Sequence, residues 1–420
     1  MIKNITGMEI LDSRGRPTVW ARCELASGIV GAASVPSGAS TGRAEAHELR
    51  DGDPGRYRGL GCRKAVENIN TRISQKVSGE KYESQESFDR ELIALDGTTE
   101  KSNLGANAIL ACSLAFARAR AAEEGVELYK YFGKLIGNSS FVLPRPTINL
   151  FSGGKHAGGQ VPIQDVLIVP VSATTMDDCL RDIYAVYQSA VDLIATKYHA
   201  RSLTADEGGL APDFTSIEGM FEDTLTAIEK AGLKPGTDVA LALDVAASHF
   251  FNGKEYGING KLLEGPAMVG LINQWTERYP ILSVEDGLAE EDWKHWSLLA
   301  TTLEGKCMVL GDDLLCTNTV RVEKAIHEKA ANALLLKVNQ CGTLTEAAEA
   351  FLLAKSQGWK VTVSARSGET EDNWLADLAT GWSGDQIKIG SITQSERLAK
   401  YNRLLELEKF ERLALNKWPG

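Results

Sequence analysis

The chain has 420 residues and a mass of 45.4 kDa, enough for two or three domains or for a small domain beside a large barrel. Its 43% hydrophobic and 24% charged residues are typical of globular proteins and exclude collagen-like and disordered classes. The 56 acidic against 45 basic residues give a formal charge of −11, so we expect neither nucleic acid nor an anionic membrane as partner. An anionic substrate would need local lysines, arginines or metal cations.

Cysteine usage and the opening residues of the sequence indicate a compartment. The seven cysteines are scattered and form no CxxC pair, which is typical of reduced thiols in a cytosol. The sequence has neither the apolar core of a secretion signal nor a run of about 18 apolar residues. We therefore expect a cytoplasmic protein that does not enter a membrane.

The first part of the chain predicts strands followed by helices. Apolar and polar residues alternate over 18–25, which indicates a strand, and a loop rich in Gly and Ser follows at 35–42. From about residue 57 to 125 the period is helical, and the Ala-rich segment 107–117 predicts close packing against other helices. This order predicts an α+β domain over residues 1–135, followed by a linker at 137–146.

Beyond residue 135, short apolar runs alternate with helical stretches, and six runs end at or just before a charged residue, about one strand plus one helix apart. The charged residues are Asp244, Glu285, Asp312, Lys337, Arg366 and Lys388. In a parallel barrel such residues meet at the C-terminal ends of the strands. In the alternative, an open doubly wound sheet, they would line a crevice. Chain length and the number of units favour a (β/α)8-type barrel over residues 136–420.

The three carboxylates of this series indicate a metal site. A single Asp or Glu after a strand is more often a helix N-cap than a ligand. Asp244, Glu285 and Asp312, however, recur at barrel spacing together with Lys337 and Lys388. Ligation by carboxylates alone, without Cys or His nearby, favours a hard cation such as Mg²⁺.

The basic residues of the series predict acid–base chemistry on an anionic substrate. Lys337 and Lys388 lie inside apolar strands, so surface solvation does not explain them. Nearby cations disfavour the ammonium form, which would let Lys337 accept a proton near pH 7. Arg366 and Ser367 offer a guanidinium and a hydroxyl for a phosphate or carboxylate. The loop at 35–42 suits a lid, although its composition alone is that of an ordinary turn.

The sequence resembles the enolase family nearly from end to end. The motifs, in the order of the family, are ILDSRGRPTV (10–19), VPSGASTG (35–42), ELRDGD (48–53), GGKHAGG (153–159), DEGGLAP (206–212), ALDVAAS (242–248), SVEDG (283–287), GDDL (311–314), LLLKVNQCGT (334–343), SARSGET (364–370) and QIKIG (386–390). The resemblance implies an α/β fold with an N-terminal α+β capping domain and a C-terminal modified (β/α)8 TIM barrel. It also implies a homodimer or higher homo-oligomer and Mg²⁺-dependent interconversion of 2-phosphoglycerate and phosphoenolpyruvate.

The resemblance also implies roles for the metal and the base. The implied Mg²⁺ ligands are Asp244, Glu285 and Asp312. Ser40, in the lid loop, matches the contact to a second Mg²⁺ that accompanies the substrate. Lys337 matches the base that removes the C2 proton, and Lys388 matches the cation that supports the enolate carboxylate.

Further matches concern the substrate, a small phosphorylated or phosphonylated carboxylate. Glu207 matches the acid that serves the departing hydroxide. Arg366 and Ser367 match the phosphate binders, and His156 and Gln164 match other pocket positions.

The sequence departs from the family on the leaving-group side. Asp165 stands where enolases carry a catalytic Glu, and losing one methylene withdraws the carboxyl group by about 1.5 Å. Ala365 stands in the substrate pocket where the family carries a His, so a hydrogen-bond donor is lost. Gly287 replaces a Pro and His249 replaces a Glu near the strand ends.

Three functions remain open at this point. The first is an enolase paralogue that keeps the enolate half of the mechanism and couples it to another step, as in carboxyphosphonoenolpyruvate synthase of phosphonate antibiotic biosynthesis, where the small Ala365 would admit a larger group. The second is an ordinary phosphopyruvate hydratase in which His249 or Lys155 compensates for Asp165 and Ala365. The third is a catalytically silent enolase fold used for binding, against which the retained carboxylates and lysines count.

Overall fold

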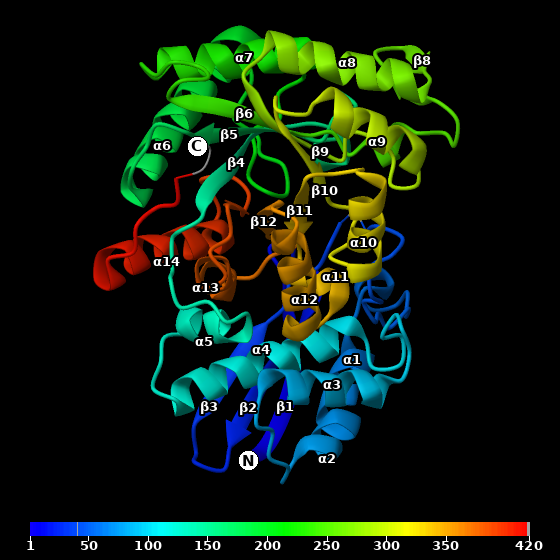
Figure 1. Ribbon diagram of the computed structural model, residues 1–420, viewed down its shortest axis with the longest axis vertical. Coiled ribbons are helices and arrows are strands. Elements are labelled where there is room, and N and C mark those ends of the chain that lie inside the picture. Colours follow the sequence, from blue (N-terminus) through cyan, green and yellow to red (C-terminus); the bar gives the residue numbers. More distant parts are fainter. Residues whose placement is uncertain (40, 418–420) are drawn as a thin grey trace.

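The computed structural model describes residues 1–39 and 41–417 and has two parts, one above the other in Figure 1. The lower part begins with a three-stranded antiparallel sheet of β1 (Ile2–Leu11), β2 (Pro17–Leu25) and β3 (Val30–Ser34). The helices that follow are η1 (Tyr57–Gly59), α1 (Arg63–Asn68), η2 (Ile69–Ile73), α2 (Ser74–Val77), α3 (Gln85–Asp96), α4 (Ala106–Glu123) and α5 (Leu128–Leu135). Strands followed by helices make this part the α+β capping domain that the sequence predicts.

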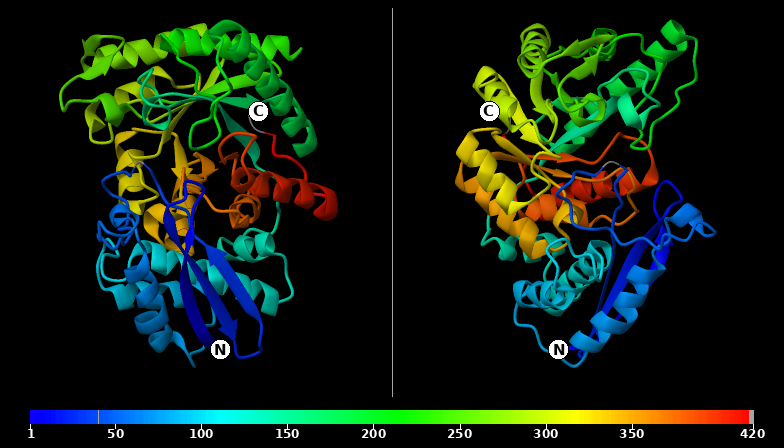
Figure 2. Two further views of the ribbon diagram at one scale, coloured as in Figure 1. Left: turned by 180° about the vertical axis from the view of Figure 1, so that it is seen from behind. Right: turned by 90° about the vertical axis from the view of Figure 1, so that its right-hand side faces the viewer.

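The Ala-rich helix α4 packs against the sheet as well as against α3 and α5 (Figure 2). Its small side chains let β3 approach closely, and Gly31 of β3 lies at the contact. A Cβ atom on Gly31 would lie 2.2 Å from the backbone N of Ala119 and 2.3 Å from the backbone O of Ala115. The close packing predicted from composition is therefore present, and its tightest partner is a strand.

The upper part is a closed eight-stranded barrel, so the open sheet is excluded. Its strands are β4 (Arg145–Ser152), β5 (Asp165–Pro170), β6 (Val239–Asp244), β9 (Ile281–Glu285), β10 (Met308–Gly311), β11 (Ala333–Leu336), β12 (Lys360–Ser364) and β13 (Gln386–Lys388). Residues 136–144 connect α5 to this barrel, so Arg145 and Pro146, assigned to the linker from sequence, belong to β4.

One strand breaks the parallel order, because β5 runs antiparallel to both β4 and β6. The other neighbouring strands are parallel. Asp165, at the start of β5, therefore pairs in register with Ser152 at the end of β4 and with Asp244 at the end of β6. The reversal brings Asp165 to the end of the barrel where the other strands finish.

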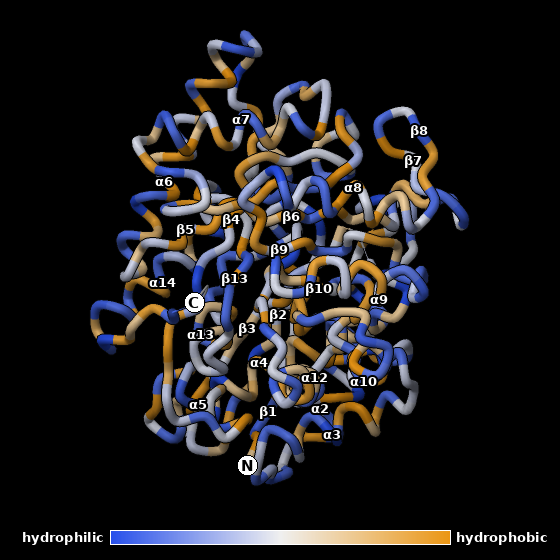
Figure 3. Tube along the Cα trace, turned by 45° about the horizontal axis from the view of Figure 1, so that its top comes forward, coloured by the Kyte–Doolittle hydropathy of each residue, from blue (hydrophilic) through white to orange (hydrophobic). Residues whose placement is uncertain are grey.

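Helices surround the barrel. They are η3 (Gly154–His156), α6 (Met176–Leu193), η4 (Ile194–Tyr198), α7 (Ile217–Lys230), η5 (Ala247–Phe250), α8 (Gly265–Arg278), α9 (Trp293–Thr302), α10 (Thr319–Glu328), α11 (Val338–Cys341), α12 (Leu344–Ser356), α13 (Trp374–Gly381) and α14 (Ser395–Glu411), with a hairpin of β7 (Tyr256–Ile258) and β8 (Lys261–Leu263). Apolar stretches follow the barrel strands in Figure 3, and polar residues mark the outer turns. Leu167, Ala242, Leu310 and Leu335 belong to one buried cluster of the strands.

The structure also bears on the expectations about a membrane and about the cysteines. Among the described helices, none combines the length and apolar character that crossing a bilayer requires. All seven cysteines are free, and Cys307 alone among them is not fully buried.

Candidate active site

The charged strand ends meet at one mouth of the barrel. Asp244 ends β6, Glu285 ends β9, and Lys388 ends β13. The Lys388 Nζ lies 2.9 Å from Asp244 Oδ2 and 2.7 Å from Glu285 Oε2. Burial alone would lower the pKa of Lys388, but the charges of Asp244 and Glu285 outweigh burial and raise it well above its ordinary value. Lys388 is therefore held as a buried cation.

A second pair lies on the next strands. Lys337 follows β11, and its ammonium pairs with Oδ2 of Asp312, which follows β10. The other oxygen of Asp312 accepts a 2.8 Å hydrogen bond from Gln340. The sequence predicts a lowered pKa for Lys337, whereas in this arrangement the Asp312 charge outweighs burial and raises it. Lys337 is the protonated partner of Asp312 as long as nothing else binds that carboxylate.

The carboxylates at this mouth fit a hard cation. Among the described residues, Oε1 of Glu285 is buried without a hydrogen-bond partner. Burial and the neighbouring Asp244 charge raise the pKa of Glu285 well above its ordinary value. A buried carboxylate oxygen that lacks a donor is stabilised by a metal ion. Because these ligands are all oxygens, the set suits Mg²⁺.

Asp286 organises the adjacent loop. Its carboxylate accepts the backbone N–H groups of Asp312 at 2.9 Å and Asp313 at 2.8 Å. Carboxylate oxygens of these three residues lie within 4.8 Å of one another and make a second acidic group able to hold a cation. Asp286 therefore fixes the position of the metal-ligand candidate Asp312.

The leaving-group side contains a chain of polar residues. Asp165 is fully buried, and its two oxygens are engaged by Ser152 Oγ at 2.6 Å and His156 Nδ1 at 3.0 Å. The Nε2 of His156 lies 4.0 Å from Glu207 Oε1, and Asn149 donates a 3.0 Å hydrogen bond to Glu207. Burial lowers the pKa of His156, but the Asp165 and Glu207 charges outweigh it and raise the pKa to about 9.

The pairs and this chain surround a small cavity of about 30 Å³, here called the reaction cavity. Its lining residues are His156, Gln164, Glu207, Asp244, Ala246, Asp286, Asp312, Asp313, Lys337, Ser364, Ala365, Arg366, Ser367 and Lys388. Gln164 donates a 3.0 Å hydrogen bond to Asp244. Neither Asp165 nor Glu285 belongs to the lining, because their carboxylates turn to Ser152 and His156 and to Lys388 respectively.

The N-terminal part contacts two residues that line this cavity. The guanidinium of Arg366 pairs with both carboxylate oxygens of Glu45, at 3.0 and 3.2 Å. The hydroxyl of Ser367 accepts a 3.1 Å hydrogen bond from the backbone N–H of Ala39. The loop predicted as a lid thus contacts Ser367, and Glu45, three residues beyond this loop, contacts Arg366. Ser40 lies outside the described residues.

Sequence reasoning missed several of these contributors. Glu45, Gln340 and Asp286 act through hydrogen bonds to candidate site residues, and each lies inside or beside a quoted motif or predicted strand. Arg397, on α14, donates to the backbone oxygens of Arg366 and Ser367 at 2.7 Å each. Nothing in the α14 sequence distinguishes Arg397 from a surface arginine, so only the fold reveals its role.

The two residues proposed from sequence as compensating groups face elsewhere. Lys155 and His249 line a neighbouring cavity and do not line the reaction cavity. Gly287 is buried, and a Cβ atom there would lie 3.0 Å from a side-chain carbon of Leu299. The described arrangement therefore offers no replacement for the side chains altered at Asp165 and Ala365 from these positions.

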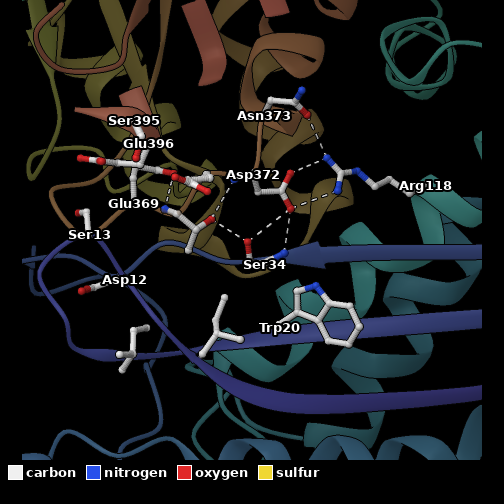
Figure 4. Close-up of a pocket in the computed structure, with 14 residues that line it drawn as sticks. Asp12, Ser13, Trp20, Ser34, Arg118, Glu369, Asp372, Asn373, Ser395 and Glu396 are labelled. Carbon is white, nitrogen blue, oxygen red and sulfur yellow. Dashed lines mark hydrogen bonds and ion pairs between the residues drawn. The ribbon is translucent and has the colours of Figure 1, made fainter. Parts of the chain in front are cut away.

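A larger cavity, of about 730 Å³, lies between the N-terminal sheet and the loop after β12. Figure 4 shows Asp372 bonded to Arg118 and Ser34 across the boundary of the two parts. This contact ties α4 and β3 to the barrel. Its residues lack the paired lysines and carboxylates of the reaction cavity.

A barrel that gathers carboxylates and lysines at the C-terminal ends of its strands has the architecture of a barrel enzyme. Two family models match the chain: the enolase N-terminal domain matches residues 2–132, and the enolase C-terminal TIM barrel domain matches residues 140–416. The chain belongs to the enolase family and is an enzyme of the enolase superfamily by its domain content. Mg²⁺ dependence is general in that family.

Proposed function

We propose that this protein forms a Mg²⁺-stabilised enolate from a substrate of the 2-phosphoglycerate or phosphoenolpyruvate type and couples it to altered leaving-group chemistry, as in carboxyphosphonoenolpyruvate synthase. One observation carries the proposal. The base and enolate-binding groups surround the reaction cavity, whereas the Asp165 carboxylate on the opposite side is bound to Ser152 and His156 and does not reach it.

Two lysines serve the half of the proposed mechanism that removes the proton and forms the enolate. Lys337 lines the cavity and takes the C2 proton once its ammonium has lost both a proton and the Asp312 pair. Lys388 lies between Asp244 and Glu285 and places a fixed positive charge beside the enolate carboxylate. Mg²⁺ held by Asp244, Glu285 and Asp312, with a second ion at Ser40, would supply charge stabilisation for the enolate oxygens.

Arg366 and Ser367 bind the phosphate or phosphonate group of the substrate in the proposed mechanism. Both line the cavity, and the guanidinium presents the fork geometry that suits a phosphate or phosphonate. Glu45 occupies this guanidinium in the described structure, so an incoming anion competes with it. Ala365 leaves space beside these groups where the family carries a larger side chain.

On the leaving-group side, His156 is the proton donor that lines the cavity. Its raised pKa of about 9 keeps it protonated at neutral pH, while Asp165 holds its Nδ1. Burial raises the pKa of Glu207, but His156 and Arg397 outweigh burial and lower it, so Glu207 is ionised. The leaving-group side therefore presents the His156 imidazolium, which lies between the carboxyl groups of Asp165 and Glu207.

One observation favours the second candidate, an ordinary phosphopyruvate hydratase. Glu207, the match to the family's acid, does line the reaction cavity. A hydratase of this kind would expel hydroxide with the proton of His156, while the ionised Glu207 stabilises the imidazolium.

Restoring the family's side chains tests the proposal. The double change Asp165→Glu with Ala365→His should extend a carboxyl group by about 1.5 Å and return a donor to the cavity. Phosphoenolpyruvate formation from 2-phosphoglycerate and Mg²⁺ should then rise at least tenfold, since general acid help is worth about 10²–10⁴-fold. The two single variants are the controls. If the unmodified protein already dehydrates as fast as the double variant, the hydratase is the correct function.

A further inference from the structure

A second cavity adjoins the reaction cavity. It has a volume of about 340 Å³ and is called here the annex cavity. Its lining residues are Gly154, Lys155, Gly158, Gly159, Val161, Pro162, His249 and Phe250. This volume falls within the range of roughly 300–1,000 Å³ typical of small-molecule sites.

The two cavities share a wall. His156 and Gln164 line the reaction cavity, while Lys155 and Pro162, their close neighbours in the same loop, line the annex. On the other side, Ala246 belongs to the reaction cavity and His249 to the annex. A molecule in the annex would therefore lie beside the leaving-group side of the reaction cavity.

The charge of the annex is opposite to that of the whole protein. The chain carries a net charge of −11, yet no Asp or Glu of the described residues lines this cavity. The Lys155 side chain is exposed, and within the described residues no hydrogen bond or ion pair engages its ammonium. A cavity with a lysine and without a carboxylate attracts anions.

The remaining lining offers donors and an apolar wall. Gly158 and Gly159 have positive φ angles of 85° and 82°, and the position of a Cβ on either is open within 4 Å. Among the described residues, their backbone N–H groups have no acceptor. Val161 and Phe250 supply apolar surface to the same lining.

We propose that the annex cavity binds a small organic oxyanion, a phosphonate or a carboxylate, whose charge is held by Lys155 and whose carbon skeleton lies on Val161 and Phe250. Its position beside the leaving-group side of the reaction cavity suits a second reactant of the proposed function. That role rests on the proposed function, whereas the binding itself does not.

Direct binding to the full-length protein tests this proposal. Phenylphosphonate and benzoate are the probes, because their phenyl ring suits the apolar part of the annex lining and because the pair separates phosphonate from carboxylate recognition. Calorimetry should show saturable binding of at least one probe. Lys155→Met should weaken that binding at least tenfold, and Lys155→Arg should retain it within about threefold, since it preserves the charge.

Two controls locate the binding. Lys294→Met removes the same charge from an exposed lysine on α9 and should leave the affinity unchanged. Arg366→Met should also leave it unchanged, because Arg366 lines the other cavity. Absence of binding by both probes, equal affinity of the wild type and Lys155→Met, or loss of binding in Arg366→Met alone would each overturn the proposal.

Two measurements distinguish failure of the annex proposal from failure of the proposed function. A protein that binds a probe through Lys155 but does not exchange the C2 hydrogen of 2-phosphoglycerate retains the annex site and loses the enolate chemistry. A protein that exchanges this hydrogen but binds neither probe loses only the annex site.

Discussion

Buried charges at the barrel mouth are grouped with opposite charges from other strands of the barrel. Lys388 joins Asp244 and Glu285, and Lys337 joins Asp312. Removing one member leaves the other buried without its partner, which is more costly than losing a surface pair. Single substitutions here therefore report on the chemistry of a whole pair.

Asp312→Ala should abolish tight Mg²⁺ binding, because it removes one of three carboxylates that the site offers to a hard cation. Isothermal titration with Mg²⁺ should show a loss of at least about tenfold in affinity. Asp192→Ala, an exposed position on α6, is the matched control and should bind Mg²⁺ as the wild type does. Unchanged affinity in Asp312→Ala would remove this residue from the ligand set.

Lys337→Ala should lose the exchange of the substrate C2 hydrogen with deuterated water. The reason is that Lys337 is the basic group after β11 that lines the reaction cavity. Proton NMR of 2-phosphoglycerate should show exchange slower by about 10²-fold or more. Lys254→Ala, at an exposed turn, controls for the loss of one positive charge. Exchange at the wild-type rate in Lys337→Ala would assign the proton to another base.

Asp165→Asn should lower the pKa of His156 from its value of about 9, because the Asp165 charge is the largest contribution opposing burial. A folded-state pKa above the ordinary 6.5 stabilises the fold below about pH 6.5, and this stabilisation is lost as pH rises through 9. Proton NMR titration of the histidine C–H resonances measures the pKa directly. The variant should also lose part of the wild-type advantage in thermal stability at pH 7 over pH 9.5.

Asp192→Asn is the control for this titration and should leave the His156 pKa unchanged, because its side chain is exposed on α6. If the His156 pKa stays near 9 in Asp165→Asn, Glu207 supplies the dominant charge and Asp165 does not position the ring.

Among the elements, β3 and α4 approach each other closely at Gly31. Gly31→Ala should destabilise the protein, because the new Cβ would meet backbone atoms of Ala115 and Ala119 at 2.3 and 2.2 Å. Overpacking of this kind typically costs about 1–3 kcal/mol. Thermal unfolding should show a lowered midpoint for the variant.

Gly270→Ala is the matched control on α8, where nothing lies within 4 Å of the new Cβ. Replacing a helical glycine with alanine there should raise stability by up to about 1 kcal/mol. Equal midpoints for Gly31→Ala and the wild type would mean that β3 and α4 can separate without cost.

The barrel strands also show which features of the fold sequence periodicity predicts and which it does not. The alternation of apolar runs and helices predicts a barrel, and the closed barrel confirms it. Periodicity does not report strand direction, so the antiparallel β5 is visible only in the structure. Because of that reversal, Asp165 contacts Ser152 and His156, a contact that no spacing in the sequence indicates.

At the scale of the whole molecule, spacing in the sequence predicts only part of the candidate site. Their positions at strand ends predict that Asp244, Glu285 and Lys388 meet at one mouth, because the strand ends of a barrel lie close together. The contacts of Lys388 with both carboxylates confirm this prediction. The ion-pair partner of Arg366 is Glu45, which lies 321 residues earlier in the sequence, and a repeat pattern carries no information on it. The family resemblance supplied the remaining candidate roles.

The homo-oligomer implied by the resemblance remains a prediction. Met8 and Trp20 are register partners on β1 and β2, and Met8 is 50% exposed. Sedimentation should give twice the 45.4 kDa chain mass, and Trp20→Glu should shift the protein towards the single-chain mass if this face is the contact. Val320→Glu, at another exposed apolar residue, is the control. A wild type that sediments as a single chain would contradict the prediction.

The central claim is that proton removal and leaving-group departure are uncoupled in this protein. The most direct measurement follows 2-phosphoglycerate with Mg²⁺ in deuterated water and records C2 hydrogen exchange and phosphoenolpyruvate formation in one sample. The account predicts exchange at least about a hundredfold faster than phosphoenolpyruvate formation, because the base side is intact and the Asp165 side is not. Phosphoenolpyruvate formation at tens per second, a rate typical of an efficient enzyme, would contradict it.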